Sequence, residues 1–347
     1  MLNKLLGKFS KDLGIDLGTK NTLVYTEEKG IVVNEPSVVA VNMRTDEILA
    51  VGEEARKMIG KTPAHIQAIK PLVDGVISDF EVTEKMIKYF IDKVHSASFT
   101  LVPRPRVVIG IPLDITEVEK KAVEDAAKSA GARQVYLIEE SMAAAIGAHL
   151  PVAEATATMI VDIGGGTTEI AVISLGGVVT WKSLRLAGNA MDNDIIEYIR
   201  EEFNILVGEQ VSENVKIKIG SATPLKEPIE MEVRGRDLIN GLPKAVTIND
   251  NQVREAISRT ISQIIENIKI TLETTPPELV SDIYEHGIYL TGGGALLRGL
   301  DKEIAQATKI PVRIADDPLT CVVRGAGILL SDPELLEKVL LPGSEEM

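Results

Sequence analysis

Cysteine and aromatic residues are scarce in this chain of 347 residues. Cys321 is the single cysteine, so no internal disulfide can form and a reducing compartment is expected. Aromatic residues make up only 3% of the chain, which leaves Ile, Val, Leu and Ala to build the core. The chain is longer than one typical hydrophobic core supports, so at least two domains are expected.

Long apolar runs and basic clusters are also missing. No stretch approaches the roughly 20 apolar residues of a membrane-spanning helix, and the N-terminus lacks the apolar core and cleavage site of a signal peptide. The net charge is −14, and the sequence contains no Lys/Arg cluster large enough to form a basic binding surface. Both features argue against nucleic-acid binding. A globular cytoplasmic protein is the expectation.

A glycine turn between two apolar runs is the most informative feature that is present. Within Met159–Ile173, three glycines and two threonines separate two runs rich in β-branched residues, which predicts a strand, a turn and a second strand. Glycine lets a ligand approach the backbone, and successive N–H groups of such a turn bind anions such as phosphate. Asp162 is an acid in an otherwise apolar strand, and a hydrated Mg2+ on a nucleotide would compensate its burial. A flexible glycine-rich hairpin is the alternative.

The same order of residues occurs again near the N-terminus. Leu13–Tyr25 contains an apolar strand, Asp16, one apolar residue, Gly18, a polar turn and another apolar strand. Gly287–Leu297 adds a third glycine turn after an apolar strand, followed by a helical pattern. Three such turns, two of them with an acid at the same place, are difficult to explain as linkers. The sequence therefore predicts a phosphate-binding site built from several turns.

Two segments carry apolar residues of ambiguous role. In Met1–Lys11 these residues recur at helical spacing with lysines off that stripe, which predicts a short amphipathic helix. This helix either anchors the protein to anionic lipid, or it is a terminal helix that packs on its own domain or frays. The loop 97–105 either folds back onto its domain or forms a second lipid-contacting patch. The apolar residues are Leu2, Leu5, Leu6, Phe9 and Leu13 in the first segment and Phe99, Leu101 and Val102 in the second.

Strands and helices alternate along the rest of the chain, which predicts an α/β layer architecture. Strands are expected at 106–111, 135–138 and 178–184, with several short strands over 30–49. Helices are expected at 53–59, 82–94, 116–131, 143–148, 192–202 and 253–272, and a terminal helix is expected to begin at 324–328. The polar segment 207–245, broken by Pro and Gly, is expected to be an inserted subdomain.

Taken together, these motifs resemble the actin/Hsp70/sugar-kinase ATPase superfamily and, within it, the MreB family of bacterial actins. The residues that carry the resemblance are Gly14–Thr19, Asn34–Val38, Val161–Glu169, Thr275–Leu279 and Leu290–Asp301. The resemblance covers nearly the whole chain. It implies an α/β fold of the duplicated actin-like (ribonuclease H-like) type, with two halves around a nucleotide cleft and a small inserted subdomain in each half.

The resemblance also implies four subdomains. Residues 1–32, 66–146 and 315–347 would form the first large subdomain (IA), and residues 33–65 the small subdomain inserted in it (IB). Residues 147–181 and 246–314 would form the second large subdomain (IIA), and residues 182–245 its small insertion (IIB).

The family's site residues can be carried over one by one onto this sequence, with ATP and Mg2+ as the implied cofactors. Asp16 and Asp162 would hold Mg2+ through water. Gly18, Thr19, Lys20 and Asn21 would form the first phosphate loop, and Gly164, Gly165, Gly166 and Thr167 the second. Glu213, Asn214 and Lys216 would lie at the ribose and adenine, and Gly292, Gly293, Gly294 and Ala295 would border the adenosine. Glu140, with Thr167, would position the attacking water. Without the resemblance, the preferred interpretation of Glu140 is an acid favoured at a helix start by the dipole.

Four positions depart from the family's usual residues. Lys20 stands in place of Ala, Ser141 in place of Pro, Asn189 in place of Asp, and Asn214 in place of Arg. A cation at position 20 either tightens nucleotide binding or points to solvent. These changes bear on the hydrolysis rate and the base contacts rather than on the fold.

The resemblance implies an ATP-dependent cytoskeletal protein whose slow hydrolysis of ATP weakens its filaments. Such filaments, as paired antiparallel protofilaments at the inner face of the cell membrane, would organise peptidoglycan synthesis with MreC, MreD, RodZ and wall-synthesis enzymes. The alternatives are a small-molecule kinase of the same fold, an Hsp70-type chaperone and a nucleotide-binding ATPase that does not polymerise. No segment is dedicated to a kinase substrate pocket, and little chain follows residue 330 to form a peptide-binding domain.

Overall fold

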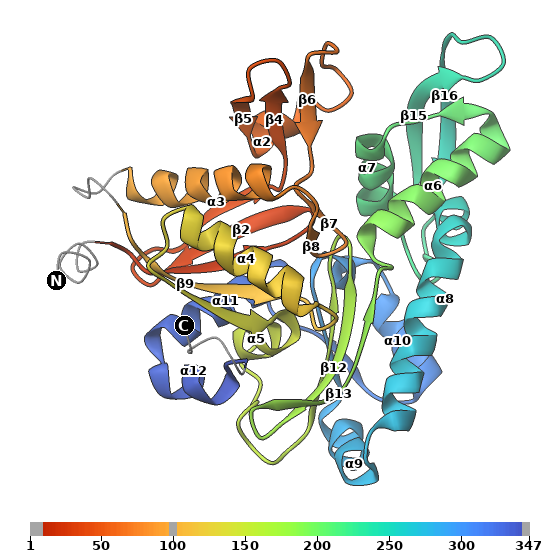
Figure 1. Cartoon of the computed structure of the whole chain (residues 1–347). Helices are drawn as coiled ribbons and strands as arrows, with labels where there is room; N and C mark the ends of the chain where they lie inside the picture. Colours follow the sequence, from red (N-terminus) through yellow and green to blue (C-terminus); the bar gives the residue numbers. More distant parts are fainter. Residues whose placement is uncertain (1–9, 97–102, 342–347) are drawn as a thin grey trace. The chain divides into compact units, whose positions relative to one another are not determined.

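The computed structural model describes residues 10–96 and 103–341 (Figure 1). The chain divides into two compact units. Unit 1 comprises Met1–Thr156, Ile173–Val179 and Leu319–Met347, and unit 2 comprises Ala157–Val172 and Thr180–Pro318.

The sheet of unit 1 has five strands in the order β10-β9-β1-β2-β3. β1 (Leu13–Leu17) pairs antiparallel with β2 (Asn21–Thr26), as the sequence pattern predicts for a hairpin, and β2 pairs antiparallel with β3 (Gly30–Pro36). β1 also pairs in parallel with β9 (Arg106–Ile111), which pairs in parallel with β10 (Gln134–Glu139). The carboxyl ends of β1, β9 and β10 therefore meet at one edge of the sheet.

Among the described residues of unit 1, five helices accompany this sheet. They are α3 (Phe80–His95), α4 (Glu117–Ser129), α5 (Glu140–Gly147), α11 (Cys321–Ser331) and α12 (Pro333–Val339). α4 begins with the expected capping box, in which Thr116 and Glu119 bond each other's backbone N–H. α5 and α11 pack with their backbones in close contact, because a Cβ on Gly325 would lie 1.8 Å from the carbonyl oxygen of Ala143.

Short elements complete unit 1. β4 (Val39–Asn42) pairs with β5 (Glu47–Val51) and β6 (Ile66–Ile69) in a three-stranded sheet, and β7 (Leu72–Val73) pairs with β8 (Val76–Ile77). A helix was expected over 53–59, but α2 covers only Glu53–Arg56. The residues after α2 continue as turns with bonds between residues three apart, so a regular helix does not extend to Ile59.

The second five-stranded sheet has the order β13-β12-β11-β17-β18. Its strands are β11 (Thr158–Ile163), β12 (Thr168–Ser174), β13 (Gly177–Leu184), β17 (Ile288–Thr291) and β18 (Val312–Ile314). β17 pairs in parallel with both β11 and β18. The two sheets have the same strand order. In that order, β3, β2, β1, β9 and β10 correspond to β13, β12, β11, β17 and β18. The predicted duplication is therefore confirmed.

Five helices and a small sheet belong to unit 2. The helices are α6 (Gly188–Phe203), α7 (Glu209–Ile219), α8 (Asp250–Thr274), α9 (Pro277–His286) and α10 (Leu300–Thr308). The small sheet contains β14 (Ile205–Leu206), β15 (Glu230–Asp237) and β16 (Pro243–Asn249). α8 has the expected long apolar face and ends before the two prolines at 276 and 277.

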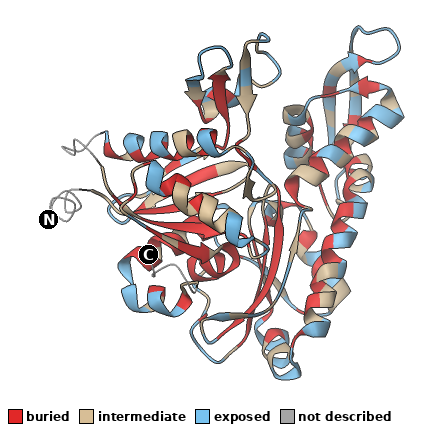
Figure 2. Ribbon diagram, viewed as in Figure 1, coloured by how far each residue is buried: buried red, intermediate tan, exposed pale blue. Residues whose placement is uncertain are grey.

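Each unit has its own aliphatic core. In unit 1, one buried cluster joins β1, β9 and α3 through residues such as Leu13, Ile109 and Phe90. In unit 2, another joins β11, α6 and α8 through Met159, Ile195 and Ile264. None of these six residues is more than 1% exposed. Figure 2 shows the buried residues concentrated in the large sheets and on the helix faces that cover them. None of the helices within residues 10–96 and 103–341 is both long and apolar enough to cross a membrane.

Several helices begin earlier than the sequence predicts, among them α5 at Glu140 and α8 at Asp250. α6 was expected to begin at Asp192 but begins at Gly188, because the small residues before Met191 give no apolar periodicity from which a helix could be read. The terminal helix was expected from Arg324, but α11 already begins at Cys321. After the third glycine turn, a 3-10 turn (Gly293–Leu296) precedes α10, so the helical pattern there is interrupted.

Candidate functional site

The first acid–glycine turn lies at the carboxyl end of β1 in unit 1. Asp16 is half-buried, and the turn that follows it is fixed by a side chain and a backbone N–H from other parts of the unit. The Ser37 hydroxyl donates to the carbonyl oxygen of Gly18 at 2.6 Å, and the N–H of Gly75, in the β7–β8 turn, donates to Oγ1 of Thr19 at 2.9 Å. The predicted phosphate loop is therefore a braced turn rather than a flexible hairpin.

Glu140 lies at the same edge of the unit 1 sheet. It is the first residue of α5, directly after β10, and only 9% of its surface is exposed. Both interpretations of Glu140 agree with this position, because the residue is a helix-start acid and also lies at the sheet edge where β1, which contains Asp16, ends. A Cβ on Gly110, in the intervening strand, would lie 3.2 Å from Cγ of Glu140, so the glycine makes room for the carboxylate side chain.

The second acid–glycine turn, at the end of β11 in unit 2, is fixed by the start of a helix. The N–H of Gly188 donates to the carbonyl oxygen of Gly164 at 3.1 Å, and the N–H of Asn189 donates to that of Gly165 at 2.8 Å. The turn is closed by the N–H of Gly164, which donates to the carbonyl oxygen of Thr167 at 2.9 Å. α6 therefore starts directly on the glycine turn, which explains its early beginning.

Asp162 precedes this turn and is the most deeply buried of the predicted magnesium ligands. Only 7% of the residue is exposed, and its Oδ1 has no hydrogen-bond partner of acceptable geometry. Burial raises the pKa of Asp162 to about 6, and the neighbouring Thr291 hydroxyl opposes this increase. An acid held in this way has a free-energy cost that a cation would relieve, which suits a magnesium ligand.

The third glycine turn lies against the second. Gly292 follows β17, which is paired with β11 so that Asp162 lies opposite Thr291. Gly292 has φ +77°, and a Cβ on it would lie 2.4 Å from both Oδ1 of Asp162 and the carbonyl oxygen of Ile163. A Cβ on Gly294 would lie 2.2 Å from the side chain of Ile163. These glycines are required because two backbone segments touch where each strand ends.

The predicted ribose and adenine residues lie on α7 in the same unit. Lys216 donates to the carbonyl oxygen of Gly188 at 2.7 Å, and its Nζ lies 2.7 Å from Oδ1 of Asp192. At the same C-terminal end of α7, the Arg298 guanidinium donates to the carbonyl oxygen of Gly220 at 3.1 Å. α7 is thus attached both to the start of α6 and to the segment after the third glycine turn. Glu213 is half-buried and Asn214 is exposed on the same helix.

The predicted site residues are divided between the two units. Unit 1 holds Asp16, Gly18, Thr19, Lys20, Asn21 and Glu140; unit 2 holds Asp162, Gly164–Thr167, Glu213, Asn214, Lys216 and Gly292–Ala295. The assignment of these residues to one nucleotide, and the division into four subdomains, stay predictions. In the part of the chain that the structure describes, no group of three or more His, Cys, Asp or Glu side chains is arranged to hold a metal unaided.

Several residues that shape the site received no role from the sequence. Ser37 and Gly75 brace the first turn, and Gly188 and Asp192 support the second. Asp192 gave one signal, since it is an acid among the apolar and small residues at the expected start of α6. The contacts of Ser37 and Gly75 connect residues 19 and 56 positions apart, so no local pattern could reveal them.

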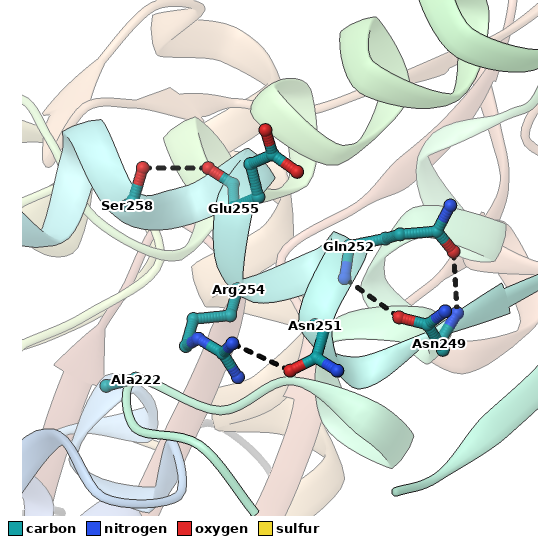
Figure 3. Close-up of a pocket in the computed structure, with 7 residues that line it drawn as sticks. All are labelled: Ala222, Asn249, Asn251, Gln252, Arg254, Glu255 and Ser258. Atoms are coloured by element: carbon teal, nitrogen blue, oxygen red, sulfur yellow. Dashed lines mark hydrogen bonds between the residues drawn. The ribbon is translucent and has the colours of Figure 1, made fainter.

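A separate hollow of about 500 Å³ lies at the start of α8 in unit 2. Its lining is polar and comes mainly from α8 and the residue before it (Figure 3). Asn249 and Gln252 exchange capping hydrogen bonds, and Arg254 donates to Asn251 at 2.7 Å, so its wall is already hydrogen-bonded internally. None of the predicted nucleotide residues lines it.

The predicted lipid-contacting residues lie outside the described residues, except Leu13. Leu2, Leu5, Leu6 and Phe9 precede residue 10, and Phe99, Leu101 and Val102 fall within 97–102. Leu13 itself is fully buried in β1, so it belongs to the core and not to a lipid-facing stripe. The Pro103 end of the second segment is described, and it leads directly into β9.

Comparison with known proteins agrees with this geometry. The chain is 54% identical over 331 residues to the cell shape-determining protein MreB of Escherichia coli (strain K12), covering 94% of this chain and 95% of that protein. It is 48% identical to the cell shape-determining protein Mbl of Bacillus subtilis (strain 168), covering 95% and 98% of the two chains. 

Solved structures show the same fold. MreB5 of Spiroplasma citri bound to ADP is 38% identical and superposes with a TM-score of 0.89, covering 95% of this chain and 98% of that one. The MamK double helical filament, at 24% identity and a TM-score of 0.78, covers 92% and 98% and supports the actin-like fold. The model of the MreB/Mbl protein family matches residues 10–338. By sequence and by fold, this chain belongs to the MreB/Mbl family.

Proposed function

We propose that this chain is an ATP-dependent actin-like cytoskeletal protein that directs cell shape by organising peptidoglycan synthesis. The relatives at 48–54% identity are named as cell shape-determining proteins, and the match runs over nearly the whole of each chain. The observation that carries the proposal is the repeated acid–glycine turn, which ends the central strand of two sheets with the same strand order. A duplicated turn of this kind suits a ligand with several phosphates.

The proposed ligand is ATP with Mg2+. MreB5 of Spiroplasma citri was crystallised with ADP and with AMPPNP, which supports a nucleotide in this family. Asp16 and Asp162 would hold Mg2+ through water, and the Gly18–Asn21 and Gly164–Thr167 turns would hold the phosphates. The buried Oδ1 of Asp162, which lacks a hydrogen-bond partner, fits this role. When bound, the ion would neutralise phosphate charge.

Glu140 and Thr167 are the proposed residues for the attacking water. Water is a weak nucleophile, so a carboxylate that orients it and accepts its proton would speed hydrolysis. Glu140→Ala should therefore retain ATP binding and slow phosphate release by roughly 100-fold, the lower end of general-base effects. A variant that binds ATP and releases phosphate at the wild-type rate would remove Glu140 from this role.

We propose that the protein lies at the inner face of the cell membrane, and contacts at the described ends of the two proposed lipid-contacting segments support this location. The N–H of Lys11 donates to Nε2 of His95, at the end of α3, at 3.0 Å. The N–H of Arg104 donates to the Ser10 hydroxyl at 2.8 Å, and Arg106 pairs with Asp12 at 2.7 Å. The chain leaving residue 10 and the chain entering residue 103 therefore start side by side. Two lipid-contacting segments in each copy, repeated along a filament, would bind lipid by avidity.

The proposed partners are other copies of the chain, the membrane surface, and MreC, MreD, RodZ and wall-synthesis enzymes. The turn between β15 and β16 supports self-association, because Ile239 is 80% exposed and Leu242 62% exposed. Neighbouring apolar side chains that face water favour a partner that covers them.

Electron microscopy of the purified chain with Mg2+ and ATP, with and without anionic lipid vesicles, tests the proposal. Filaments that need ATP and lie on the vesicles are the expected result. A non-polymerising ATPase would hydrolyse ATP without forming filaments or pelleting. A small-molecule kinase would instead transfer phosphate to an added hydroxylated substrate, and that outcome would overturn the cytoskeletal function.

A further inference from the structure

Arg298 joins two segments of unit 2 that both carry predicted nucleotide-binding residues. Its Nη1 donates to the carbonyl oxygen of Gly220 at 3.1 Å and to that of Ile217 at 3.3 Å. Both oxygens lie at the carboxyl end of α7, where the last carbonyl groups of a helix lack partners within the helix and a positive charge is favourable. The guanidinium therefore holds the end of α7 from outside the helix.

The main chain of Arg298 is bonded to the residues that follow α7. Its carbonyl oxygen accepts from the N–H of Ala222 at 2.7 Å and from the hydroxyl of Ser221 at 3.1 Å. Ser221 is fully buried and forms an isolated parallel β-bridge with Arg298. The side chain and the main chain of one residue thus hold both the end of α7 and the chain that leaves it, so α7 cannot shift without breaking these bonds.

The two segments that Arg298 joins lead directly to the predicted ribose and adenine contacts. On α7, Lys216 lies in the last turn and Glu213 lies about one turn earlier. On the other segment, the 3-10 turn Gly293–Leu296 closely precedes Arg298. Arg298 itself is exposed and belongs to neither set of predicted contacts. Its bonds therefore fix where α7 lies relative to the third glycine turn.

We propose that Arg298 is a positioning residue for the nucleoside part of a nucleoside di- or triphosphate. By bonding the end of α7 to the segment after the third glycine turn, it keeps the two sets of predicted ribose and adenine contacts at a fixed separation. Such alignment before binding raises affinity, because less freedom is lost when the ligand binds. The inference rests on the proposed nucleotide function and specifies what organises the nucleoside end of that site.

The test compares the affinities of AMP, ADP and ATP at constant Mg2+ by calorimetry, using the full chain at low protein concentration. Arg298→Met keeps an unbranched stem and removes both bonds to α7. It should lower all three affinities by the same factor, roughly fivefold, which is less than the loss of a buried charged hydrogen bond because Arg298 is exposed. Unchanged affinities, or a loss that grows with each added phosphate, would overturn the inference.

Arg298→Lys separates positioning from a general loss of packing. Both bonds to α7 come from one nitrogen, so an ammonium can replace it and should restore most of the affinity. If Arg298→Lys binds all three nucleotides as weakly as Arg298→Met, the bonds to the carbonyl oxygens do not position α7 and the inference is wrong.

Arg313→Met is the matched control. Arg313 is also exposed, lies in β18 of the same unit and donates to the Tyr289 hydroxyl at 3.4 Å. This variant removes an equal charge and leaves the bonds of Arg298 in place, so it should bind all three nucleotides as wild type does. An equal loss in Arg313→Met would show that any lost positive charge in unit 2 weakens nucleotide binding, and the positioning role would be wrong.

Gly220→Ala tests the same contact from the side of α7. It leaves Arg298 in place, but the new Cβ would lie 2.3 Å from the carbonyl oxygen of Lys216 and 3.1 Å from Cδ1 of Leu297, so the end of α7 must move. It should lower the affinities for AMP, ADP and ATP by one common factor, and unchanged affinities would overturn the inference even if Arg298→Met does not fold. Wild type that binds none of the three nucleotides would instead refute the proposed function itself, so the two failures are distinguishable.

Discussion

The two acid–glycine turns occupy the same place in sheets of the same strand order, yet each unit holds its turn by different means. In unit 1, the bonds to the turn involve hydroxyl groups: the Ser37 hydroxyl donates to Gly18, and the hydroxyl of Thr19, within the turn, accepts from the N–H of Gly75. In unit 2, backbone N–H groups at the start of α6 bond the carbonyl oxygens of Gly164 and Gly165. Duplication preserved the strand and the acid, while the supports of the two turns diverged.

The acids differ in the same way. Asp16 is half-buried, whereas Asp162 is 7% exposed and lies against the backbone of Gly292. The third glycine turn therefore packs tightly against a carboxylate of unit 2 that is costly to ionise in the free protein. Changes at Gly292, which touches Asp162, should consequently have larger effects than changes at Gly18, which follows Asp16.

The largest expected difference concerns the glycines beside the two acids. Gly292→Ala should lower the free energy of unfolding of unit 2 by about 3–5 kcal/mol, because the new Cβ would meet two oxygens at 2.4 Å and φ is +77°. Gly18→Ala should cost unit 1 only about 1–2 kcal/mol, because its Cβ would meet one carbonyl oxygen at 2.8 Å in an ordinary backbone conformation.

Denaturant unfolding measures both variants. The single tryptophan, Trp181, lies in unit 2, so its fluorescence follows that unit, and circular dichroism follows the whole chain. Equal losses of stability in the two variants would show that the two turns are packed equally tightly and would contradict the comparison.

The next prediction concerns the pH dependence of stability. The pKa of Asp162 is raised by burial from 3.8 to about 6, so the folded protein binds this proton more tightly than the unfolded chain does. Its stabilising effect is complete below about pH 4 and is lost as the pH rises to about 6. The difference of about two pKa units corresponds to about 3 kcal/mol.

Asp162→Asn isolates this effect in protein without Mg2+ and nucleotide. As the pH is raised from 4 to 7, wild type should lose stability relative to Asp162→Asn, as measured by denaturant unfolding followed at Trp181. Thr291→Val removes the hydroxyl that opposes the increase in pKa, so it should move the transition to higher pH. A constant difference between wild type and Asp162→Asn over this range would contradict a raised pKa at Asp162.

Sequence patterns predicted the parts of this fold that repeat locally. The hairpins around Gly18 and Gly165, the strand at 106–111 and the long helix α8 follow from alternating or helical apolar spacing, and each is confirmed. The four residues that start α6 were missed, because Gly188 and Asn189 are held at the helix start by bonds to a turn about 24 positions earlier. The site was predictable as a set of motifs, whereas the Lys216–Asp192 contact required knowledge of how α6 and α7 pack.

A smaller effect is expected at the turn between β15 and β16 in unit 2. Ile239→Asp places a charge on a side chain that is 80% exposed, so it should leave folding and nucleotide binding unchanged. If this turn contacts another copy, burial of the isoleucine is lost, and the concentration needed for ATP-dependent pelleting should rise by roughly tenfold or more.

Leu175→Asp in unit 1 is the control for that experiment. Leu175 is 73% exposed and has φ +53°, a conformation that aspartate tolerates, so the change adds the same charge without strain. It should leave pelleting as in wild type. Pelleting that is unaffected by Ile239→Asp would exclude the β15–β16 turn from the interface.

The smallest effect is expected at His95, in the part of unit 1 that joins the two proposed lipid-contacting segments. Because the N–H of Lys11 donates to Nε2, the proton of the neutral ring lies on Nδ1, which donates to the carbonyl oxygen of Ile91 at 2.8 Å. His95→Leu removes both bonds at a buried site and should loosen residue 11 by about 1 kcal/mol. Co-sedimentation with anionic vesicles should fall by roughly fivefold.

Deletion of residues 1–11 sets the maximum loss, and His286→Leu, at an exposed position in unit 2, should change nothing. Undiminished binding by His95→Leu, together with a loss on deletion, would show that the N-terminal segment holds lipid without this support.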